Sequence, residues 1–499
     1  MTRFCFKRLV YSILVLSKHI TKTMSQYKSN KVFSEINDFF SSQEKAVSKT
    51  MMIIKALKIR GIKFEPKNNW PEQYYRQDIL LTLLLMPLFS IKNVTGYTQS
   101  VLYDYLQAGK DTLYRFKNES SISWRRITDK VNRRIIKRIK QSGARDTETP
   151  RCLIVDDTDL RKTGKGIEHV SKIWSHVAHT SVLGFKGLFL GYWDSKTFLG
   201  LDFSLHKEKG KNQKCPNGLS KKVNSKQYKK QRTDQSPGHQ REAELHMDKI
   251  SSAIAMIQRA VSNKIRFEYV LMDSWFVCEK MMQCVVQTGA YLIGMCKMGT
   301  SKYACNGQLR SAKQILDRLR KDGKMRWNKQ LHLYVAEALV AYKGIPMKLF
   351  FCRNSKRGNW HLLVTTNTGL GIKKAYQTYA IRWSIEVFFK EAKQYFQLAK
   401  CQSRDFDAQI ADTSICLIQY NIFSLAKRFS NYETLGGLFD DTKQFVMELT
   451  VCKRLWEFFL EFIQIIALIV DVDPDELIER ILAEDAENKF VKLVQLNAA

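Results

Sequence analysis

The chain has 499 residues, more than one hydrophobic core usually serves, so we expect several domains. Its 44% hydrophobic and 26% charged residues, with only 8 prolines, exclude a disordered or low-complexity chain. A formal net charge of +33, from 81 Lys and Arg against 48 Asp and Glu, favours a polyanionic partner, nucleic acid before a membrane surface, over charge that serves solubility alone.

The region 1–150 is predicted to be helical. An apolar helix or helix pair is expected over Asp78–Leu88, and helical periodicity runs from Thr98 to Lys140, with Lys and Arg concentrated toward its end. A basic helical module of this kind can lie on DNA phosphates, although a helix whose charged face is only solvated has the same sequence pattern. We therefore predict a helical N-terminal DNA-binding region over residues 1–150.

Two stretches near the chain ends could suggest targeting or membrane segments. The apolar run Leu9–Ser17 follows basic residues but lacks a small-residue cleavage site, and Met24 could be the true start in place of Met1. The apolar run Leu455–Val470 carries a polar stripe and is predicted to be a buried or partner-facing helix. Eleven cysteines without a C-x-x-C pair indicate reduced thiols in a cytoplasm.

From Arg151 the pattern changes to short strands. Cys152–Val155, Gly187–Trp193 and Phe198–Leu205 predict three antiparallel strands. The segment 207–241 is rich in Lys and Arg and poor in apolar residues, which predicts a mobile basic loop.

An α/β alternation follows. We expect a helix over Glu242–Val261, a strand over Phe267–Met272, a helix over Phe276–Gln287 and a strand over Tyr291–Met295. Residues 151–295 would thus form the first part of a core.

The remaining chain divides into three parts. Residues 296–366 favour a mostly-β insertion subdomain with one helix at Ala312–Arg320, and 367–430 return to long helices as the second part of the core. Residues 431–499 are predicted to be a helical C-terminal region with a possible role in dimerisation.

Aspartates follow two of the predicted strands. Asp156 comes after an apolar run within the motif VDDT, and Asp273 after another within MDSWF. Carboxylates at the ends of neighbouring buried strands point into a common crevice, and Mg²⁺ prefers such oxygen ligands. Turn or helix-cap residues give the same pattern, so this signal is weak by itself.

Four polar residues fall on one side of the helix predicted over Ile372–Leu398. At about 100° per residue, Tyr379, Arg382, Glu386 and Lys393 share one narrow face. An ordinary salt-bridged surface helix is the alternative. Together with the two aspartates, however, a carboxylate flanked by cations suits phosphodiester chemistry, in which three carboxylates hold two metal ions and Arg382 and Lys393 clamp phosphates.

The spacing Tyr-x2-Arg-x3-Glu-x6-Lys within YAIRWSIEVFFKEAK resembles the Y-R-E-K signature of the DDE transposases of the bacterial insertion-sequence-four group. The motifs VDDT and MDSWF are similar to that family's two aspartate regions, and the resemblance covers about residues 151–430. It implies an α/β fold with an RNase H-like core that a β-strand insertion interrupts before the glutamate helix. It also implies cut-and-paste transfer of element ends.

Carried over by position, the resemblance implies catalytic and metal-binding roles for Asp156, Asp273 and Glu386. It assigns DNA binding to Tyr379, Arg382 and Lys393, and two Mg²⁺ or Mn²⁺ ions as cofactors. Asp157 remains the alternative to Asp156 as the first ligand. Trp327 and Trp360 could stack on a flipped base, but a core role is the commoner explanation.

Two further motifs do not support other chemistry. His169, His176 and His179 lack cysteine or acidic ligands at zinc spacing beyond Glu168. The run Gly164-Lys165-Gly166 lacks the pattern of a phosphate-binding loop, so we expect no nucleotide cofactor.

The sequence therefore predicts a metal-dependent transposase, with a non-catalytic DNA-binding regulator or a simple nuclease as alternatives. Its expected partners are the terminal inverted repeats and target DNA, bound by a homodimer in a synaptic complex. We expect a cytoplasmic, nucleoid-associated protein without a membrane span.

Overall fold

The computed structural model describes residues 53–64, 74–100, 102–143, 148–210, 212–448 and 450–451. The described residues up to 440 belong to one compact unit. The alternative start sites and the apolar run Leu455–Val470 lie outside the described residues. Within the described residues, no helix is both long and apolar enough to cross a membrane.

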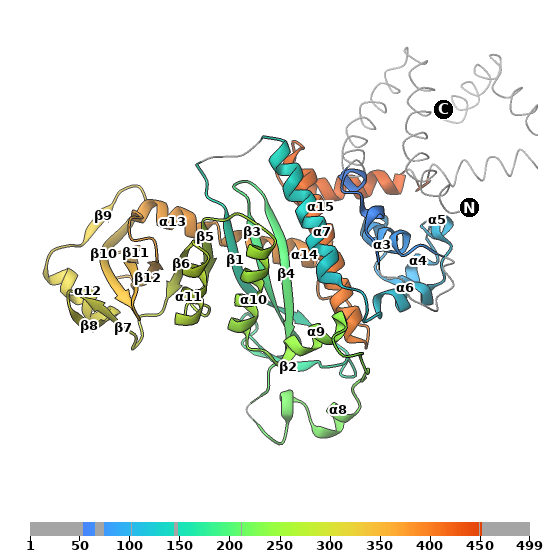
Figure 1. Ribbon diagram of the computed structural model, residues 1–499, viewed down its shortest axis with the longest axis horizontal. Helices are drawn as coiled ribbons and strands as arrows, with labels where there is room; N and C mark the ends of the chain where they lie inside the picture. Colours follow the sequence, from blue (N-terminus) through green and yellow to red (C-terminus); the bar gives the residue numbers. More distant parts are fainter. Residues whose placement is uncertain are drawn as a thin grey trace, which may run out of the picture. The chain divides into compact units, whose positions relative to one another are not determined.

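The described strands form one 12-stranded sheet, in the order β2-β3-β1-β5-β6-β12-β11-β10-β7-β8, with β4 paired to β3 and β9 to β10 (Figure 1). The first six strands are β1 (Cys152–Arg161), β2 (Ser171–Ser175), β3 (Thr180–Trp193), β4 (Phe198–His206), β5 (Tyr269–Met272) and β6 (Tyr291–Cys296). The other six are β7 (Lys302–Cys305), β8 (Gln308–Ser311), β9 (Arg326–Asn328), β10 (Leu333–Tyr342), β11 (Ile345–Arg353) and β12 (His361–Thr365).

Strand β1 lies at the centre of the first half of the sheet. It pairs antiparallel with β3, which pairs antiparallel with β4, and it pairs parallel with β5, which pairs parallel with β6. The sequence pattern predicted that β1 would end at Val155, but the strand continues to Arg161 because β3 supplies partners along its whole length. Strand β5 pairs with β1 only along Cys152–Val155. Among the described residues, the rest of β1 therefore has no partner strand on that side.

The segment 296–366 carries six of the strands and helix α12 (Ala312–Lys321). The helix begins with a capping box, in which the Ser311 hydroxyl and the Gln314 side chain satisfy each other's backbone N–H groups. Strand β12 pairs antiparallel with β6, so the strands of this segment continue the sheet of the preceding segment.

The N-terminal described residues are helical. They comprise η1 (Ile59–Gly61), α3 (Arg76–Leu85), η2 (Met86–Phe89), α4 (Val94–Tyr97), α5 (Tyr103–Leu106), α6 (Lys110–Lys117) and α7 (Trp124–Gln141). Helix α7 packs on β4 and on α15 (Phe406–Arg428), as Figure 1 shows. Buried amides join the three elements, because Asn421 Nδ2 donates to Asn132 Oδ1 at 2.7 Å and Gly200 N donates to Asn421 Oδ1 at 2.8 Å.

The segment 207–241, for which a mobile basic loop was predicted, contains η3 (Pro216–Gly218), α8 (Lys221–Ser225) and the first residues of α9 (Pro237–Ala243). Ion pairs of its Lys and Arg side chains, rather than burial of apolar side chains, hold this segment in place. Arg232 has no exposed side-chain surface and pairs with Glu168 at 2.7 Å and with Asp407 at 3.2 Å. Lys230 pairs with Asp407 at 2.8 Å.

The helix predicted over Glu242–Val261 is interrupted. After η4 (Glu244–His246), helix α10 (Lys249–Ser262) begins at a new N-cap, Asp248, whose carboxylate accepts the Ser251 N–H at 2.9 Å. Helix α11 (Glu279–Gln287) then joins β5 to β6.

The helix predicted over Ile372–Leu398 is also divided, into α13 (Ile372–Ala380) and α14 (Trp383–Tyr395). At the junction, backbone hydrogen bonds run to the third residue back, as from Arg382 N to Tyr379 O at 2.9 Å. This tighter turn separates the two helices without leaving the helical region of backbone angles.

Candidate active site

Asp156 and Asp157 lie on opposite faces of β1, because successive strand residues point to opposite sides. Asp156 is paired with Arg382 at the start of α14, with 2.9 Å between Oδ2 and Nη1. Asp157 is paired with Lys249 at the start of α10, with 2.5 Å between Oδ2 and Nζ. The two neighbouring carboxylates thus face different helices, and only Asp156 faces the helix that carries Glu386.

Asp273 is the first residue after β5, in an Asx-type turn. Its Oδ1 accepts the N–H of Trp275 at 2.9 Å and that of Phe276 at 3.4 Å. The parallel register pairs Val155 with Met272, and an aspartate follows each of these two residues. Asp156 and Asp273 therefore lie side by side where the pairing of β1 with β5 ends.

Arg382 joins Asp156 to Glu386. Its Nη2 donates to Glu386 Oε1 at 2.6 Å while its Nη1 donates to Asp156, so one guanidinium holds carboxylates from a strand and a helix. Burial raises the pKa of Asp156 to about 7, against the lowering effect of the Arg382 charge, and the negative charge of Asp273 adds to the rise.

Tyr379 and Lys393 extend the same surface. The Arg382 guanidinium lies 5.8 Å from the centre of the Tyr379 ring, and burial raises the pKa of the Tyr379 hydroxyl. Lys393 Nζ donates to Thr158 Oγ1 at 2.7 Å, two residues along β1 from Asp156, and burial lowers the pKa of this ammonium. Hence Tyr379, Arg382, Glu386 and Lys393 do meet the β1 carboxylate region, although they come from two helices.

A cavity of about 490 Å³ adjoins this site. Tyr379, Arg382 and Trp383 line one part of it, and Arg353 and His361 of the 296–366 segment line another. Trp360, which the sequence placed in that segment, stacks on the Arg353 guanidinium at 4.4 Å, while Trp327 lies 4.7 Å from the ring of Tyr334.

Sequence reasoning missed Lys249 and Trp275. The Lys249 ammonium lies 3.8 Å from the centre of the Trp275 ring as well as beside Asp157. Trp275 was visible within the MDSWF motif, but Lys249 fell inside a predicted amphipathic helix. Its only available signal was the preceding Asp248, which caps the helix.

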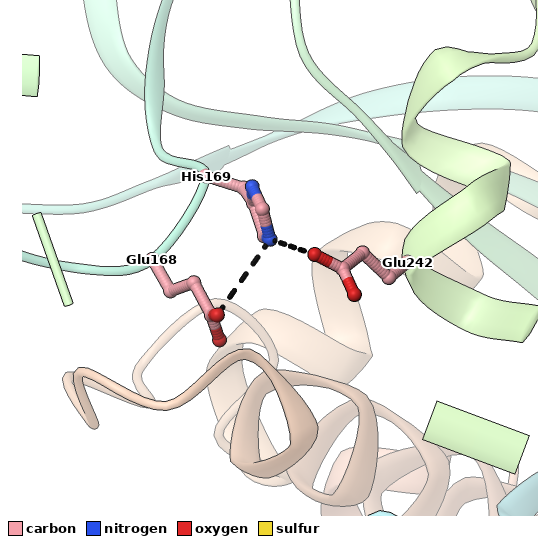
Figure 2. A group of neighbouring side chains, drawn as sticks. All are labelled: Glu168, His169 and Glu242. Atoms are coloured by element: carbon pink, nitrogen blue, oxygen red, sulfur yellow. Dashed lines mark ion pairs between the residues drawn. The ribbon is translucent and has the colours of Figure 1, made fainter. Parts of the chain in front are cut away.

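A more compact group of acidic and histidine side chains lies elsewhere (Figure 2). Within the part of the chain that the structure describes, Glu168, His169 and Glu242 are the one set of at least three such residues with ligand atoms within 4.8 Å of one another. His169 Nε2 lies 2.8 Å from Glu242 Oε1, without the geometry of a hydrogen bond, and burial lowers the pKa of the imidazole.

This group already has a cation beside it. Glu168 Oε2 accepts Arg232 Nη2 at 2.7 Å and Phe406 N at 3.1 Å, and Glu242 Oε2 lies 3.3 Å from Arg232 Nη1. The sequence-based dismissal of a histidine zinc site did not anticipate Glu242, which belongs to α9. Because Arg232 contacts both glutamates, we interpret the group as part of a buried ion-pair network.

The family model described as DDE superfamily endonuclease matches residues 71–332, more than half of the chain. The matched range contains β1 and β5, with Asp156 and Asp273, and ends before α14. A search of curated proteins finds no match.

Proposed function

Because the chain belongs to the DDE superfamily endonucleases, we propose that it is a DNA transposase that cuts at the ends of an insertion sequence. The freed 3′-OH groups would then join to target DNA. The single observation that carries this proposal is the Arg382 bridge between Asp156 and Glu386, beside the turn that holds Asp273. Residues from two strands and a helix far apart in sequence thus supply three carboxylates to one region.

The sheet supports an RNase H-like core for this enzyme. Along β4-β3-β1-β5-β6, three antiparallel strands are followed by two parallel ones, with the first aspartate on the central strand. The 296–366 strands come between β6 and the glutamate helix in sequence, as the Y-R-E-K group of the insertion-sequence-four transposases would require. This order supports our proposal that the chain belongs to that group.

The ligand atoms of Asp156, Asp273 and Glu386 do not all lie within 4.8 Å of one another, and the Arg382 guanidinium lies between Asp156 and Glu386. The fit to divalent metal ions therefore rests on the chemistry of the donors. Asp156, Asp273 and Glu386 offer hard carboxylate oxygens, and they would hold two Mg²⁺ or Mn²⁺ ions. Bound ions would activate the attacking oxygen and stabilise the leaving 3′ oxygen. We prefer Asp156 to Asp157 as the first ligand because Asp156 faces the helix that carries Glu386, whereas Asp157 faces α10. Arg382 lies between two of these carboxylates and contributes a positive charge there.

The cations of the site would bind DNA. Arg382 offers a planar fork to a phosphate, Lys393 a point charge and Tyr379 a hydroxyl donor. Helix α7 would add a second contact, because its exposed Arg133, Lys137 and Lys140 recur on the face away from α15 and β4. The net charge of +33 accords with such an extended contact.

We further propose that two copies act together on terminal inverted repeats and target DNA, in the cytoplasm and associated with the nucleoid. The alternative is a regulator that binds the same ends without cutting. The presence of all three carboxylates favours the enzyme.

The test uses DNA carrying the inverted repeats that flank the gene. The wild-type chain with Mg²⁺ should give cleaved ends and joined products, while Glu386→Gln should bind the same DNA and leave it intact. Binding without cleavage by the wild-type chain in both Mg²⁺ and Mn²⁺ would favour the regulator. Cleaved ends that never join would indicate a simple nuclease.

A further inference from the structure

Four successive side chains on the part of β1 beyond its pairing with β5 each contact a different cation. The contacts are Asp156 with Arg382, Asp157 with Lys249, Thr158 with Lys393 and Asp159 with Lys186. The proposed function accounts for the first and third. The two remaining pairs, both of an aspartate with a lysine, differ in ways that indicate different roles.

The pair of Lys186 with Asp159 is closed to solvent. Its lysine side chain is 6% exposed and its aspartate 12%, and both residues belong to paired strands. The Lys249 and Asp157 side chains are 21% and 20% exposed. An ammonium has three donors, so Lys249 can keep its bond to Asp157 and still donate to a ligand.

The position of Lys249 does not serve its own helix. It is the first residue of α10, after the N-cap Asp248. The N-terminus of a helix carries partial positive charge, so a lysine there costs helix stability, whereas an acidic residue would contribute to it. The site therefore keeps a cation where local helix energetics disfavour one.

Trp275 connects Lys249 to the second aspartate region. The indole lies under the ammonium at 3.8 Å, although 49% of the residue is exposed. Its backbone N–H is bonded to Asp273. Lys249 is thus fixed by Asp157, next to Asp156, and by Trp275, two residues from Asp273.

We propose that Lys249 binds a backbone phosphate of the DNA strand on the side of the carboxylates away from α14. Asp157 and Trp275 orient its ammonium as positioning residues. The strand would then be held between two cations on opposite sides of β1, Arg382 from α14 and Lys249 from α10. This inference rests on the proposed function, since it takes DNA as the ligand.

The first experiment measures binding without divalent ions, so it does not depend on cleavage. Affinity for a short DNA duplex is measured against salt concentration. Because each phosphate contact contributes about 0.9 to the slope of log affinity against log salt, Lys249→Met should lower the slope by about 0.9. Lys249→Arg should keep the slope. An unchanged slope in Lys249→Met would overturn the proposal.

A double variant separates phosphate binding from neutralisation of Asp157. Lys249→Met should also reduce cleavage in Mg²⁺. If Lys249 only neutralises Asp157, then combining Asp157→Asn with Lys249→Met should restore that cleavage. If Lys249 binds phosphate, the double variant should keep both the lower slope and the loss of cleavage. Restored cleavage with a wild-type slope would overturn the inference.

Trp275 variants test the positioning role. Trp275→Phe keeps an aromatic face under the ammonium and should retain the slope, whereas Trp275→Ala should lower it as Lys249→Met does. A wild-type slope in Trp275→Ala would exclude the indole from this role. Failure of the proposed function itself would appear differently, as a wild-type chain that shows no salt-dependent binding to DNA.

Discussion

Arg382 and Asp156 form an ion pair with 2.9 Å between Nη1 and Oδ2, across 226 residues of sequence. Both side chains are 15% exposed, so solvent screens the pair little. The same guanidinium bonds to Glu386 at 2.6 Å. Arg382 is therefore the cation that joins the Asp156 carboxylate to that of Glu386, whose side chain is 34% exposed.

The first prediction follows from this bridge. Arg382→Gln should lower the free energy of unfolding by about 1.5–3 kcal/mol without divalent ions, because charged hydrogen bonds to Asp156 and Glu386 are lost. Added Mg²⁺ should then raise the melting temperature more in the variant than in the wild type, since both carboxylates lack their cation. Thermal unfolding with and without Mg²⁺ measures both effects.

Lys390→Gln is the matched control, because Lys390 is an exposed cation on the same helix. It should change neither the metal-free stability nor the response to Mg²⁺. If Mg²⁺ raised the melting temperature of Arg382→Gln and the wild type equally, the Arg382 guanidinium would not occupy the place of a metal ion between the carboxylates.

Much of this site follows from sequence periodicity. The spacing of Arg382, Glu386 and Lys393 defines a face that depends only on helix geometry, and the break before α14 does not disrupt it. The apolar runs before Asp156 and Asp273 gave the strands, and parallel pairing brought their ends together. Local patterns are sufficient where local geometry alone sets the direction of a side chain.

The rest of the site depends on partners distant in sequence. The full length of β1 comes from its pairing with β3, which an apolar run ending at Val155 could not indicate. Similarly, Arg232 appears in the sequence as one cation among many in a basic segment. Its burial follows from carboxylates 64 and 175 residues away, which no local pattern reveals.

The second prediction concerns helix α7. Replacing the exposed Arg133, Lys137 and Lys140 by methionine together should lower the slope of log DNA affinity against log salt by about 2.7, if each contacts one phosphate at about 0.9 apiece. Cleavage at saturating DNA should remain, since these residues lie outside the carboxylate site. Binding titrations over a range of salt concentrations measure the slope.

Arg134 provides the control on the same helix. Its Nη1 donates to the carbonyls of Leu57 at 2.7 Å and Lys58 at 2.9 Å, so its role is structural. Arg134→Met should reduce stability without changing the slope. If the triple variant also kept the wild-type slope, the DNA path would not follow α7.

The third prediction is a pH dependence of stability at Asp129. Burial and the nearby charge of Asp202 raise the pKa of Asp129 from 3.8 to about 6. The folded state therefore holds this proton more tightly than the unfolded state, so the stabilisation is complete below about pH 3.8 and is lost as the pH rises through about 6.

Asp129→Asn has no ionisable group at this position, so its stability does not fall as the pH rises for this reason. The stability of the variant relative to the wild type should increase with pH between these two values, as thermal unfolding at a series of pH values would show. Asp317→Asn, at an exposed position of α12, controls for the removal of one acidic residue. A pH-independent difference for Asp129→Asn would contradict the raised pKa.

The fourth prediction concerns Arg232, whose side chain has no exposed surface and pairs with Glu168, Glu242 and Asp407. Arg232→Met should lower the free energy of unfolding by about 3–5 kcal/mol, because it leaves buried carboxylates without their cation. Arg318→Met removes an arginine that is 48% exposed and should cost about 0.5 kcal/mol or less. Urea unfolding compares the two variants directly.

A second substitution identifies the cause of that loss. Adding Glu168→Gln to Arg232→Met removes one buried carboxylate charge that has lost its cation, so part of the stability should be recovered. If the loss of stability came only from packing, the second substitution would recover none of it. The same variants test the Glu168, His169 and Glu242 group. If Arg232 supplies the positive charge there, Zn²⁺ should stabilise Arg232→Met more than the wild type. Equal stabilisation would mean that the guanidinium does not compete for this group.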